Sequence, residues 1–299
     1  LTTTVMACRC KKILAPAMNT NMYENPILQD NLDICRRYGM EVITPAWGYL
    51  ACGDTAAGKM PEPEVLYEYI LREAGYPGDL AGRRILVTAG PTRESIDPVR
   101  YITNHSTGKM GYAIARVAAY RGADVTLVSG PVDLPRPLFV ETVPVESARE
   151  MFEAVTARSG EQDIIVKAAA VADYRPATVG TEKIKKSDGD LSIALERTND
   201  ILAWLGQNRR DGQFLCGFSM ETQNMLENSR AKLAKKHIDM IVANNLKVEG
   251  AGFGTDTNVV TLITRDSETE LPIMTKEEVA DCLLTEILKR TKEQDGIQG

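Results

Sequence analysis

The sequence lacks any apolar run long enough to span a membrane, so we expect no membrane segment. It offers few groups for metal binding or disulfide pairing, with 2 histidines and 6 scattered cysteines in 299 residues. No CxxC pair occurs, which excludes the usual structural zinc sites, and reduced thiols in a cytoplasmic protein are the simplest interpretation. Acidic residues also outnumber basic ones, 41 to 35, and the resulting net charge of −6 argues against a nucleic-acid partner.

Two common phosphate-binding motifs are missing as well. The strand pattern at 83–90 runs into "AGPT" without the GxGxxG of dinucleotide-binding folds, and the next strand ends in Ser129 and Gly130 rather than in an acidic residue. A Walker loop fails because Thr103 and Met110 stand where it needs a glycine and a hydroxyl. These absences disfavour a nicotinamide-dependent oxidoreductase.

What the sequence does contain is an alternation of strand and helix patterns. The first part predicts a strand near 12–17, a helix over 25–38, a strand at 40–44, a loop over 45–63 and a helix near 62–74. The glycine-rich stretch "GYPGDLAG" then predicts a domain boundary. We therefore expect a domain at 1–76, a linker at 77–82, a domain at 83–292 and a tail at 293–299.

Apolar and β-branched runs dominate the second domain. "RRILVTAG", "ADVTLVSG" and "DIIVKAAA" are typical of strands buried on both faces. Capping boxes, Ser147 with Glu150 and Thr275 with Glu278, mark the starts of helices between and after such strands. This alternation predicts an α/β fold with a doubly wound, mostly parallel, Rossmann-like sheet that binds ligands at the carboxyl ends of its strands.

A long polar loop, "PTRESIDPVRYITNHSTGKMG" (91–111), joins the first of these strands to a helix. It ends at the predicted helix N-terminus, where free N–H groups and the helix dipole attract anions. Asn104 offers an amide that can donate to a carbonyl or phosphoryl oxygen. The loop alone is equally compatible with a capped turn that binds no ligand, in which Ser106 and Thr107 cap the helix.

A second polar loop, at 171–190, leaves the same edge of the predicted sheet. It carries Lys183, Lys185 and Lys186 within four residues, which in isolation is compatible with a solvated surface. Asp173 lies just past the end of the preceding strand. A carboxylate in this position is suited to hold a metal ion beside phosphates.

A third basic group follows in "RAKLAKK". Lys232 and Lys236 lie one helical turn apart, so their side chains face the same way. Three sources of lysine, the "STGK" end of the loop at 91–111, the loop at 171–190 and this helix, together with Asp173 predict a site for a nucleoside triphosphate and Mg²⁺.

These motifs closely resemble the phosphopantothenoylcysteine synthetase domain of coenzyme A biosynthesis. The resemblance covers about 82–292 and rests on "AGPTRESIDPVRYITNHSTGKMG", "AAAVADYRP", "EKIKK" and "GFSMET". The first part, through "PAMNTNMYENP" and "ACGDTAAGKM", is similar to the later part of the phosphopantothenoylcysteine decarboxylase flavoprotein that precedes the synthetase in bacteria.

The synthetase resemblance implies a two-step ligation. The carboxylate of phosphopantothenate attacks the α-phosphate of CTP, which gives an acyl-cytidylate and pyrophosphate, and the amine of cysteine then displaces CMP. Lys183 matches the family lysine needed for cytidylate formation, and Asn104 matches the asparagine needed to convert the acyl-cytidylate. The positions that match nucleotide contacts are Asp173 (also the expected Mg²⁺ ligand), Lys183, Asp200, Ile201, Phe218, Lys232 and Lys236. Asn199 stands where the family has a proline.

For the decarboxylase, the resemblance implies FMN as the cofactor that oxidises the substrate thiol. Asn19 matches the residue that holds the substrate carboxylate, and Cys52 matches the proton-donating cysteine. Tyr23 replaces the family's usual tryptophan. The flavin-binding start and the catalytic histidine of the family are expected before residue 1, so we expect an N-terminally shortened chain with an incomplete decarboxylase, derived from a competent parent.

The expected substrates are small molecules: phosphopantothenate, cysteine and CTP. The resemblance also implies a homo-oligomer, with dimeric ligase domains and trimeric flavoprotein domains in the parent. Besides the oxidoreductase, one alternative outside the enzymes stays open, a flavoprotein-derived regulatory subunit without ligase activity. The intact "EKIKK" argues against it.

Overall fold

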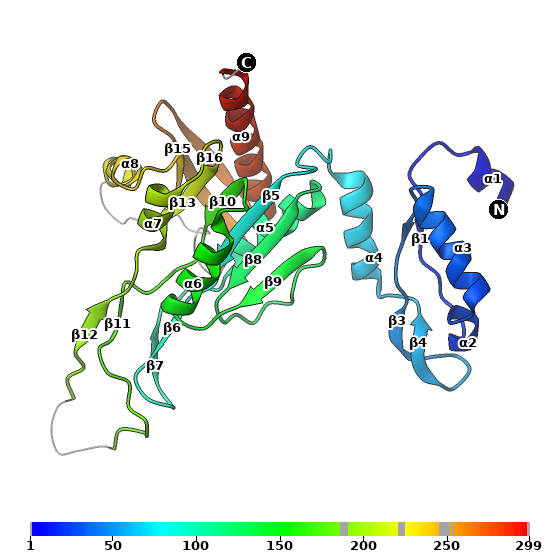
Figure 1. Ribbon diagram of the computed structural model, residues 1–299, viewed down its shortest axis with the longest axis horizontal. Helices are drawn as coiled ribbons and strands as arrows, with labels where there is room; N and C mark the ends of the chain where they lie inside the picture. The colour runs from blue at the N-terminus through cyan, green and yellow to red at the C-terminus, as the bar shows by residue number, and fades with distance from the viewer. Residues whose placement is uncertain (1, 186–190, 221–224, 245–251, 253, 298–299) are drawn as a thin grey trace. The chain divides into compact units, whose positions relative to one another are not determined.

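The computed structural model describes residues 2–185, 191–220, 225–244, 252 and 254–297 (Figure 1). The chain forms two compact units, residues 1–78 (unit 1) and 79–299 (unit 2). Lys186 of the second polar loop lies outside the described residues. Among the described helices, none is both long enough and apolar enough to cross a membrane.

Unit 1 is built from short elements. Strands β1 (Ile13–Leu14) and β2 (Glu41–Val42) pair in parallel, and β3 (Ala46–Tyr49) and β4 (Thr55–Lys59) form an antiparallel hairpin. The prediction of a loop over 45–63 is therefore wrong: a tight turn, closed by the hydrogen bond from Leu50 N to Asp54 O (2.8 Å), folds the segment back on itself. The helices are α1 (Thr2–Ala7), α2 (Thr20–Tyr23), α3 (Pro26–Arg37) and α4 (Pro63–Ile70), which continues as a π-helical turn, Leu71–Gly75.

Unit 2 is organised around an eight-stranded sheet. In spatial order its strands are β16 (Glu268–Thr275), β15 (Thr257–Ile263), β14 (Met240–Asn244), β13 (Phe214–Met220), β10 (Ile164–Lys167), β5 (Arg84–Ala89), β8 (Asp124–Ser129) and β9 (Val140–Pro144). All neighbours from β14 to β9 are parallel, and β15 and β16 are antiparallel additions at one edge. The predicted doubly wound, mostly parallel α/β fold is confirmed.

Helices cover both faces of this sheet, because its central strands are apolar on both sides. The helices are α5 (Lys109–Tyr120), α6 (Ala148–Ser159), α7 (Ile201–Asn208), α8 (Met225–Lys235) and α9 (Lys276–Ile297). α5 and α9 pack against each other on one face. α6, α7 and α8 cover the other face around a buried cluster that includes Leu86, Ile165 and Leu215.

Both predicted capping boxes are confirmed. Ser147 Oγ accepts a hydrogen bond from Glu150 N at 3.2 Å, at the start of α6. Glu278 Oε2 accepts one from Thr275 N at 2.8 Å, at the start of α9. The local sequence thus sets where these two helices begin.

The order of the strands reverses between β5 and β10. The chain passes from β5 to β8 and β9 on one side, then returns through α6 to β10, β13 and β14 on the other. Two antiparallel hairpins also lie in unit 2 (Figure 1): β6 (Arg93–Ser95) with β7 (Tyr101–Thr103), and β11 (Tyr174–Pro176) with β12 (Leu195–Arg197). The sequence predicted only loops there, because three-residue strands are too short to show a periodic pattern.

Candidate active site

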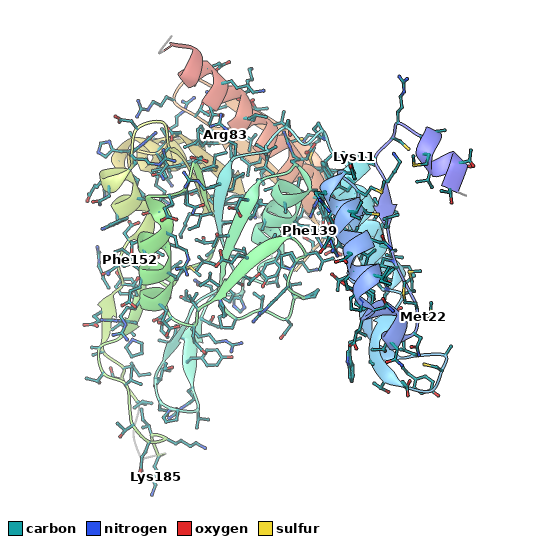
Figure 2. The ribbon with its side chains drawn as sticks, turned by 45° about the vertical axis from the view of Figure 1, so that its right-hand side comes forward. Lys11, Met22, Arg83, Phe139, Phe152 and Lys185 are labelled. Carbon is teal, nitrogen blue, oxygen red and sulfur yellow. The ribbon has the colours of Figure 1, made fainter. Side chains whose placement is uncertain are left out.

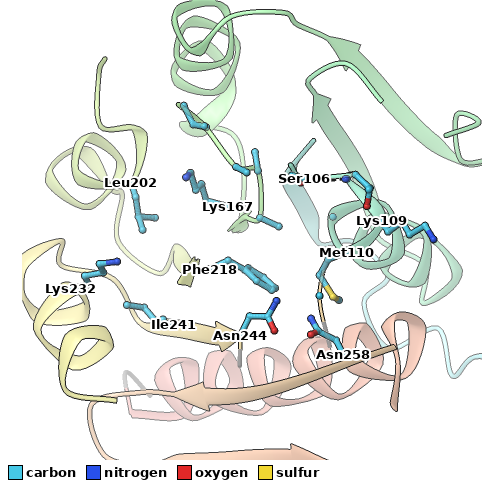
Figure 3. A pocket seen from close by; sticks show the side chains of 18 of the residues that line it. Ser106, Lys109, Met110, Lys167, Leu202, Phe218, Lys232, Ile241, Asn244 and Asn258 are labelled. Carbon is cyan, nitrogen blue, oxygen red and sulfur yellow. Dashed lines mark hydrogen bonds between the residues drawn. The ribbon is translucent and has the colours of Figure 1, made fainter. Parts of the chain in front are cut away.

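A cavity of about 290 Å³ opens at this reversal, where sheets of this type bind their ligands. Its walls come from the start of α5, the segment after β10, and the ends of β13, β14 and β15 (Figure 3). Residues of α7 and α8 complete it. The cavity therefore lies at the carboxyl ends of the parallel strands, the edge of the sheet at which this fold is expected to bind ligands.

Two glycines bring the N-terminus of α5 up to the cavity. Gly108 is the N-cap residue with φ +78°, and a Cβ there would lie 2.8 Å from Val132 Cγ1. Gly111 packs directly on β5, where a Cβ would lie 2.6 Å from Ala89 Cβ. The first residues of the helix line the cavity, and their N–H groups have no partner within the helix. This arrangement favours an anion.

Three lysines form a second, cationic wall: Lys167, Lys232 and Lys236. Lys232 Nζ lies 3.3 Å from Ser219 Oγ, and Lys236 Nζ lies 3.0 Å from Asp200 Oδ2. Burial, together with repulsion by Lys236, lowers the pKa of Lys167 to about 8. Lys232 and Lys236 line one cavity, as their spacing in the sequence predicted.

Two carboxylates accompany these lysines. Asp173 lines both the main cavity and an adjoining polar pocket, which it shares with Asp200, Ile201 and Lys236. Asp200 is the N-cap of α7 and accepts a hydrogen bond from Ala203 N at 3.0 Å. Burial acts to raise the pKa of Asp200, but this hydrogen bond and Lys236 outweigh it and hold the pKa below its usual value. Among the described residues, no three acidic, histidine or cysteine side chains cluster as a metal site.

Asn104 lies beside the main cavity rather than in its wall. It lines a neighbouring pocket, and its Nδ2 donates to Ala170 O at 2.9 Å. Ala170 in turn lines the main cavity. Neither Ser106 nor Thr107 is the N-cap of α5, contrary to the capped-turn alternative; Ser106 Oγ accepts from Gly108 N at 3.3 Å instead.

Lys183 is not among the residues that line the cavity. It is exposed on the arm that joins β11 to β12, and Figure 2 shows Lys185 near the tip of this arm. The adjacent Ile184 is fixed by the turn between β6 and β7: its N–H donates to Asp97 Oδ2 at 3.1 Å, and its carbonyl accepts from Arg100 at 3.0 Å. The structure thus brings together Asp173, Asp200, Ile201, Phe218, Lys232 and Lys236, but leaves Lys183 apart from them.

In unit 1, the two residues singled out from the sequence are in contact. Asn19 Nδ2 lies 3.2 Å from Cys52 Sγ, which also lies 3.5 Å from Asp54 Oδ2. Gly58 makes this approach possible, because a Cβ there would lie 2.1 Å from Met18 O. The hairpin β3–β4 therefore carries Cys52 to the segment of Asn19, and forms an exposed thiol site.

Family comparisons agree with this arrangement of two units. A family model described as "DNA/pantothenate metabolism flavoprotein C-terminal domain" matches residues 80–291, and one described as "Flavoprotein" matches residues 1–75. The chain belongs to the DNA/pantothenate metabolism flavoprotein family.

Individual members of the family are similar over most of their length. The coenzyme A biosynthesis bifunctional protein CoaBC of Bacillus subtilis (strain 168) is 46% identical, over 98% of this chain and 73% of that protein. A cysteine/cysteine sulfinic acid decarboxylase of an unknown prokaryotic organism is 42% identical, over 96% of this chain and 82% of that protein. The crystal structure of the C-terminal domain of a CoaBC protein has 51% identity and a TM-score of 0.62, over 72% of this chain and 100% of that domain.

The family predicted from the motifs is confirmed by these matches. So is its general role, an enzyme of coenzyme A biosynthesis that joins a ligase domain to a decarboxylase flavoprotein domain. The matches lend no support to the nicotinamide-dependent oxidoreductase or to the regulatory subunit.

Three polar residues that line the cavity were not predicted from the sequence: Lys167, Asn244 and Asn258. Each stands at or near one end of an apolar strand, and this break in the apolar run was the available signal. Asn244 Oδ1 is buried without a hydrogen-bond partner among the described residues, and Asn258 is 2% exposed. Buried amides beside a cavity are typical of ligand recognition.

Proposed function

We propose that unit 2 ligates phosphopantothenate with cysteine at the expense of CTP. The observation that carries the proposal is the cavity itself, in which Lys232, Lys236 and the N-terminus of α5 surround space beside Asp173. Such a set of groups suits a triphosphate, whose negative charge needs several cations and N–H donors.

The position of Asn104 supports the second half of the reaction. In an acyl-cytidylate, the carbonyl carbon joins the nucleotide to the acid. A side chain that contacts this carbonyl must therefore lie between the pocket for the nucleotide and the pocket for the acid. Asn104 lines one pocket, together with Arg93, His105 and Lys109, and hydrogen-bonds the wall of the other. Its amide can stabilise the carbonyl oxygen while the amine of cysteine attacks and CMP leaves.

The first step is the attack of the phosphopantothenate carboxylate on the α-phosphorus, which releases pyrophosphate. The negative charge of the leaving group grows in this step, and ammonium groups of Lys232 and Lys236 in the cavity stabilise it. Phe218 supplies an apolar surface in the same wall. Lys183 has to reach this cavity for its expected role, either from its own chain or from the second copy of the expected dimer.

Magnesium fits this cavity only in company with the nucleotide. Asp173 is a suitable oxygen ligand, whereas Asp200 is engaged with Lys236, and the described residues offer no cluster of three ligands. Mg²⁺ is usually held by one or two carboxylates together with substrate phosphates. We therefore propose that Asp173 and the phosphates hold the ion, which would neutralise part of the leaving-group charge.

For unit 1 we propose a role in decarboxylation of the ligation product. FMN, when bound, would supply oxidation of the substrate thiol and the return of the same two electrons after carbon dioxide has left. The residues of this chain act on other groups: Asn19 donates its amide to the substrate carboxylate, and Cys52 gives its thiol proton to the carbon from which carbon dioxide has left. Their contact at 3.2 Å supports a shared site, and the donor set fits a substrate carboxylate rather than the flavin ring.

The test is the release of pyrophosphate from CTP, measured with phosphopantothenate in the presence and absence of cysteine. We expect release with CTP and a cysteine-dependent amide product. Lys183→Gln should lower the rate by about 100-fold or more, the usual cost of losing a group that stabilises transition-state charge. It should leave stability unchanged, because Lys183 is exposed.

Lys185→Gln is the matched control, since Lys185 is exposed on the same arm two residues away. It removes the same charge and should retain most of the activity. Equal rates for wild type and Lys183→Gln would refute the role of Lys183, and a folded wild type that releases no pyrophosphate from any nucleoside triphosphate would refute the ligase.

A further inference from the structure

Lys167 lines the cavity, but the proposed reaction gives its charge no role. It is the last residue of β10, in the centre of the sheet, and follows three residues, Ile164, Ile165 and Val166, that are at most 1% exposed. Its side chain lies with the cavity-lining residues between Leu202 and Phe218 (Figure 3). A lysine in this setting loses hydration, which opposes its charged form.

The neighbours of Lys167 do not offset this cost. Among the described residues, its ammonium has no hydrogen-bond or ion-pair partner, whereas Lys232 contacts Ser219 and Lys236 contacts Asp200. The charged groups that act on it are Asp173 and Asp200, which favour the ammonium, and Lys232 and Lys236, which oppose it.

Lys167 also lines both compartments of the site. It belongs to the wall of the main cavity and to that of the adjoining polar pocket, as do Asp173 and Lys236. A ligand that extends from one compartment to the other must pass this ammonium. Lys167 is half-buried and has no partner among the described residues at the point where two ligand pockets meet, so an anionic group of the ligand would stabilise its ammonium.

We propose that Lys167 is a binding residue for the triphosphate, whose ammonium pairs with a phosphate oxygen at the junction of the two compartments. The inference rests on the proposed nucleotide function of this site and adds to it a residue that the motifs did not indicate. It gives the third lysine of the cationic wall a ligand contact of its own, beside Lys232 and Lys236.

The experiment compares CTP and cytidine binding to the full chain by calorimetry, for wild type, Lys167→Met and Lys167→Arg. Methionine keeps the length and packing of the side chain but removes the charge. Because a charged hydrogen bond contributes about tenfold or more in affinity, we expect the Kd for CTP to rise by at least about tenfold in Lys167→Met. Cytidine, which has no phosphate, should bind both proteins equally, and Lys167→Arg should retain most of the CTP affinity.

The pH dependence gives a second readout. The affinity of wild type for CTP should fall as the pH rises above about 8, where Lys167 loses its proton. Lys167→Met should not show this component, and Lys167→Arg should not show it either, since an arginine stays charged. Lys167→Met should also unfold at a temperature no lower than wild type without ligand, because it removes a desolvated charge.

Lys235→Met is the matched control, because Lys235 is exposed at the end of α8 and lines neither compartment. It should leave the Kd for CTP unchanged. Equal CTP affinity in wild type and Lys167→Met would overturn the inference while leaving the nucleotide site intact, and so would an equal loss of cytidine binding. Failure of wild type to bind CTP would instead overturn the proposed function on which the inference rests.

Discussion

Gly206→Ala should displace Lys236, a residue that lines the cavity, although Gly206 itself does not line it. Gly206 lies in α7, where it packs against the backbone that carries Lys236: a Cβ at Gly206 would lie 1.8 Å from Lys236 O. Ordinary contacts of a Cβ begin at about 3.4 Å, so α7 and the turn after α8 must separate by about 1.6 Å. The same movement pulls Lys236 away from Asp200, its partner at 3.0 Å.

The size of the effect follows from two opposing contributions. Alanine favours a helix over glycine by about 1 kcal/mol, which stabilises α7. Overpacking against backbone atoms that have no free rotation costs about 3 kcal/mol. The net loss of about 2 kcal/mol should lower the unfolding temperature of unit 2 by about 4–8 °C. Displacement of Lys236 by more than 1 Å should slow ligation by about 100-fold.

Tryptophan fluorescence provides the assay, because only 2 tryptophans occur in the chain. Trp204 lies in α7, two residues from Gly206, with its ring 6.0 Å from that of Phe152. Trp47 belongs to unit 1 and is 71% exposed, so Trp47→Phe removes its signal at little cost. In this background, thermal unfolding followed at Trp204 reports on α7.

Gly160→Ala is the control for the substitution itself. Gly160 has φ −62° at the end of α6, and among the described residues no heavy atom beyond its neighbours in the chain and its own helix backbone lies within 4 Å of a Cβ built there. This variant should unfold at the wild-type temperature and keep the wild-type rate of ligation. If Gly206→Ala behaved like Gly160→Ala in both respects, the close approach of α7 to Lys236 would be refuted.

Three further substitutions or labels test other parts of the fold. Arg121 is 2% exposed and donates to both carboxylate oxygens of Asp79, at 2.9 and 2.7 Å. Arg121→Met should therefore lower the free energy of unfolding by about 3 kcal/mol, measured by urea unfolding at pH 7. Arg121 lowers the pKa of Asp79, so this ion pair stabilises the fold above about pH 4, and the difference between wild type and variant should shrink below that pH; a constant difference would contradict the assignment. Asp97→Asn should weaken the hydrogen bond that holds Ile184, and so slow ligation by about tenfold and speed proteolysis of the arm that joins β11 to β12. CTP binding should stay unchanged. An unaltered rate of proteolysis would contradict the role of Asp97 in holding the arm. Cys216, which is fully buried, should react with a thiol reagent only on unfolding, whereas the exposed Cys52 should react at once.

The parts of the fold that could be predicted from the sequence depend on local patterns. Buried parallel strands give continuous apolar runs, and capping boxes such as Ser147 with Glu150 fix helix starts through contacts between close neighbours. Lys232 and Lys236 could be placed on one side of their segment because helical geometry sets their spacing.

The missing parts depend on contacts between residues far apart in sequence. Ile184, beside Lys183, is held by Asp97, 87 residues earlier, and nothing in the charge run "EKIKK" shows this partner. The motif therefore singled out Lys183 but could not indicate that it lies apart from the cavity. Lys167 escaped notice for a related reason: its setting depends on α7 and α8, which come later in the chain.

The strand order of unit 2 is that of dinucleotide-binding folds, yet its main cavity lies on the side of β10, β13 and β14. At the end of β8, a Cβ on Gly130 would lie 1.8 Å from Pro91 O, so the loop after β5 closes directly over this strand. Ser129 Oγ is engaged as well, with Gly130 O at 2.8 Å and Tyr112 Oη at 3.1 Å. A dinucleotide-binding fold uses this region for an acidic residue that holds a ribose. Here Pro91 instead continues toward β10 and pairs with Ala170, which leaves the cavity to the side of β10, β13 and β14, where the lysines lie. The same topology thus places its main cavity on the β10 side of the reversal, because the loop after β5 lies over the end of β8.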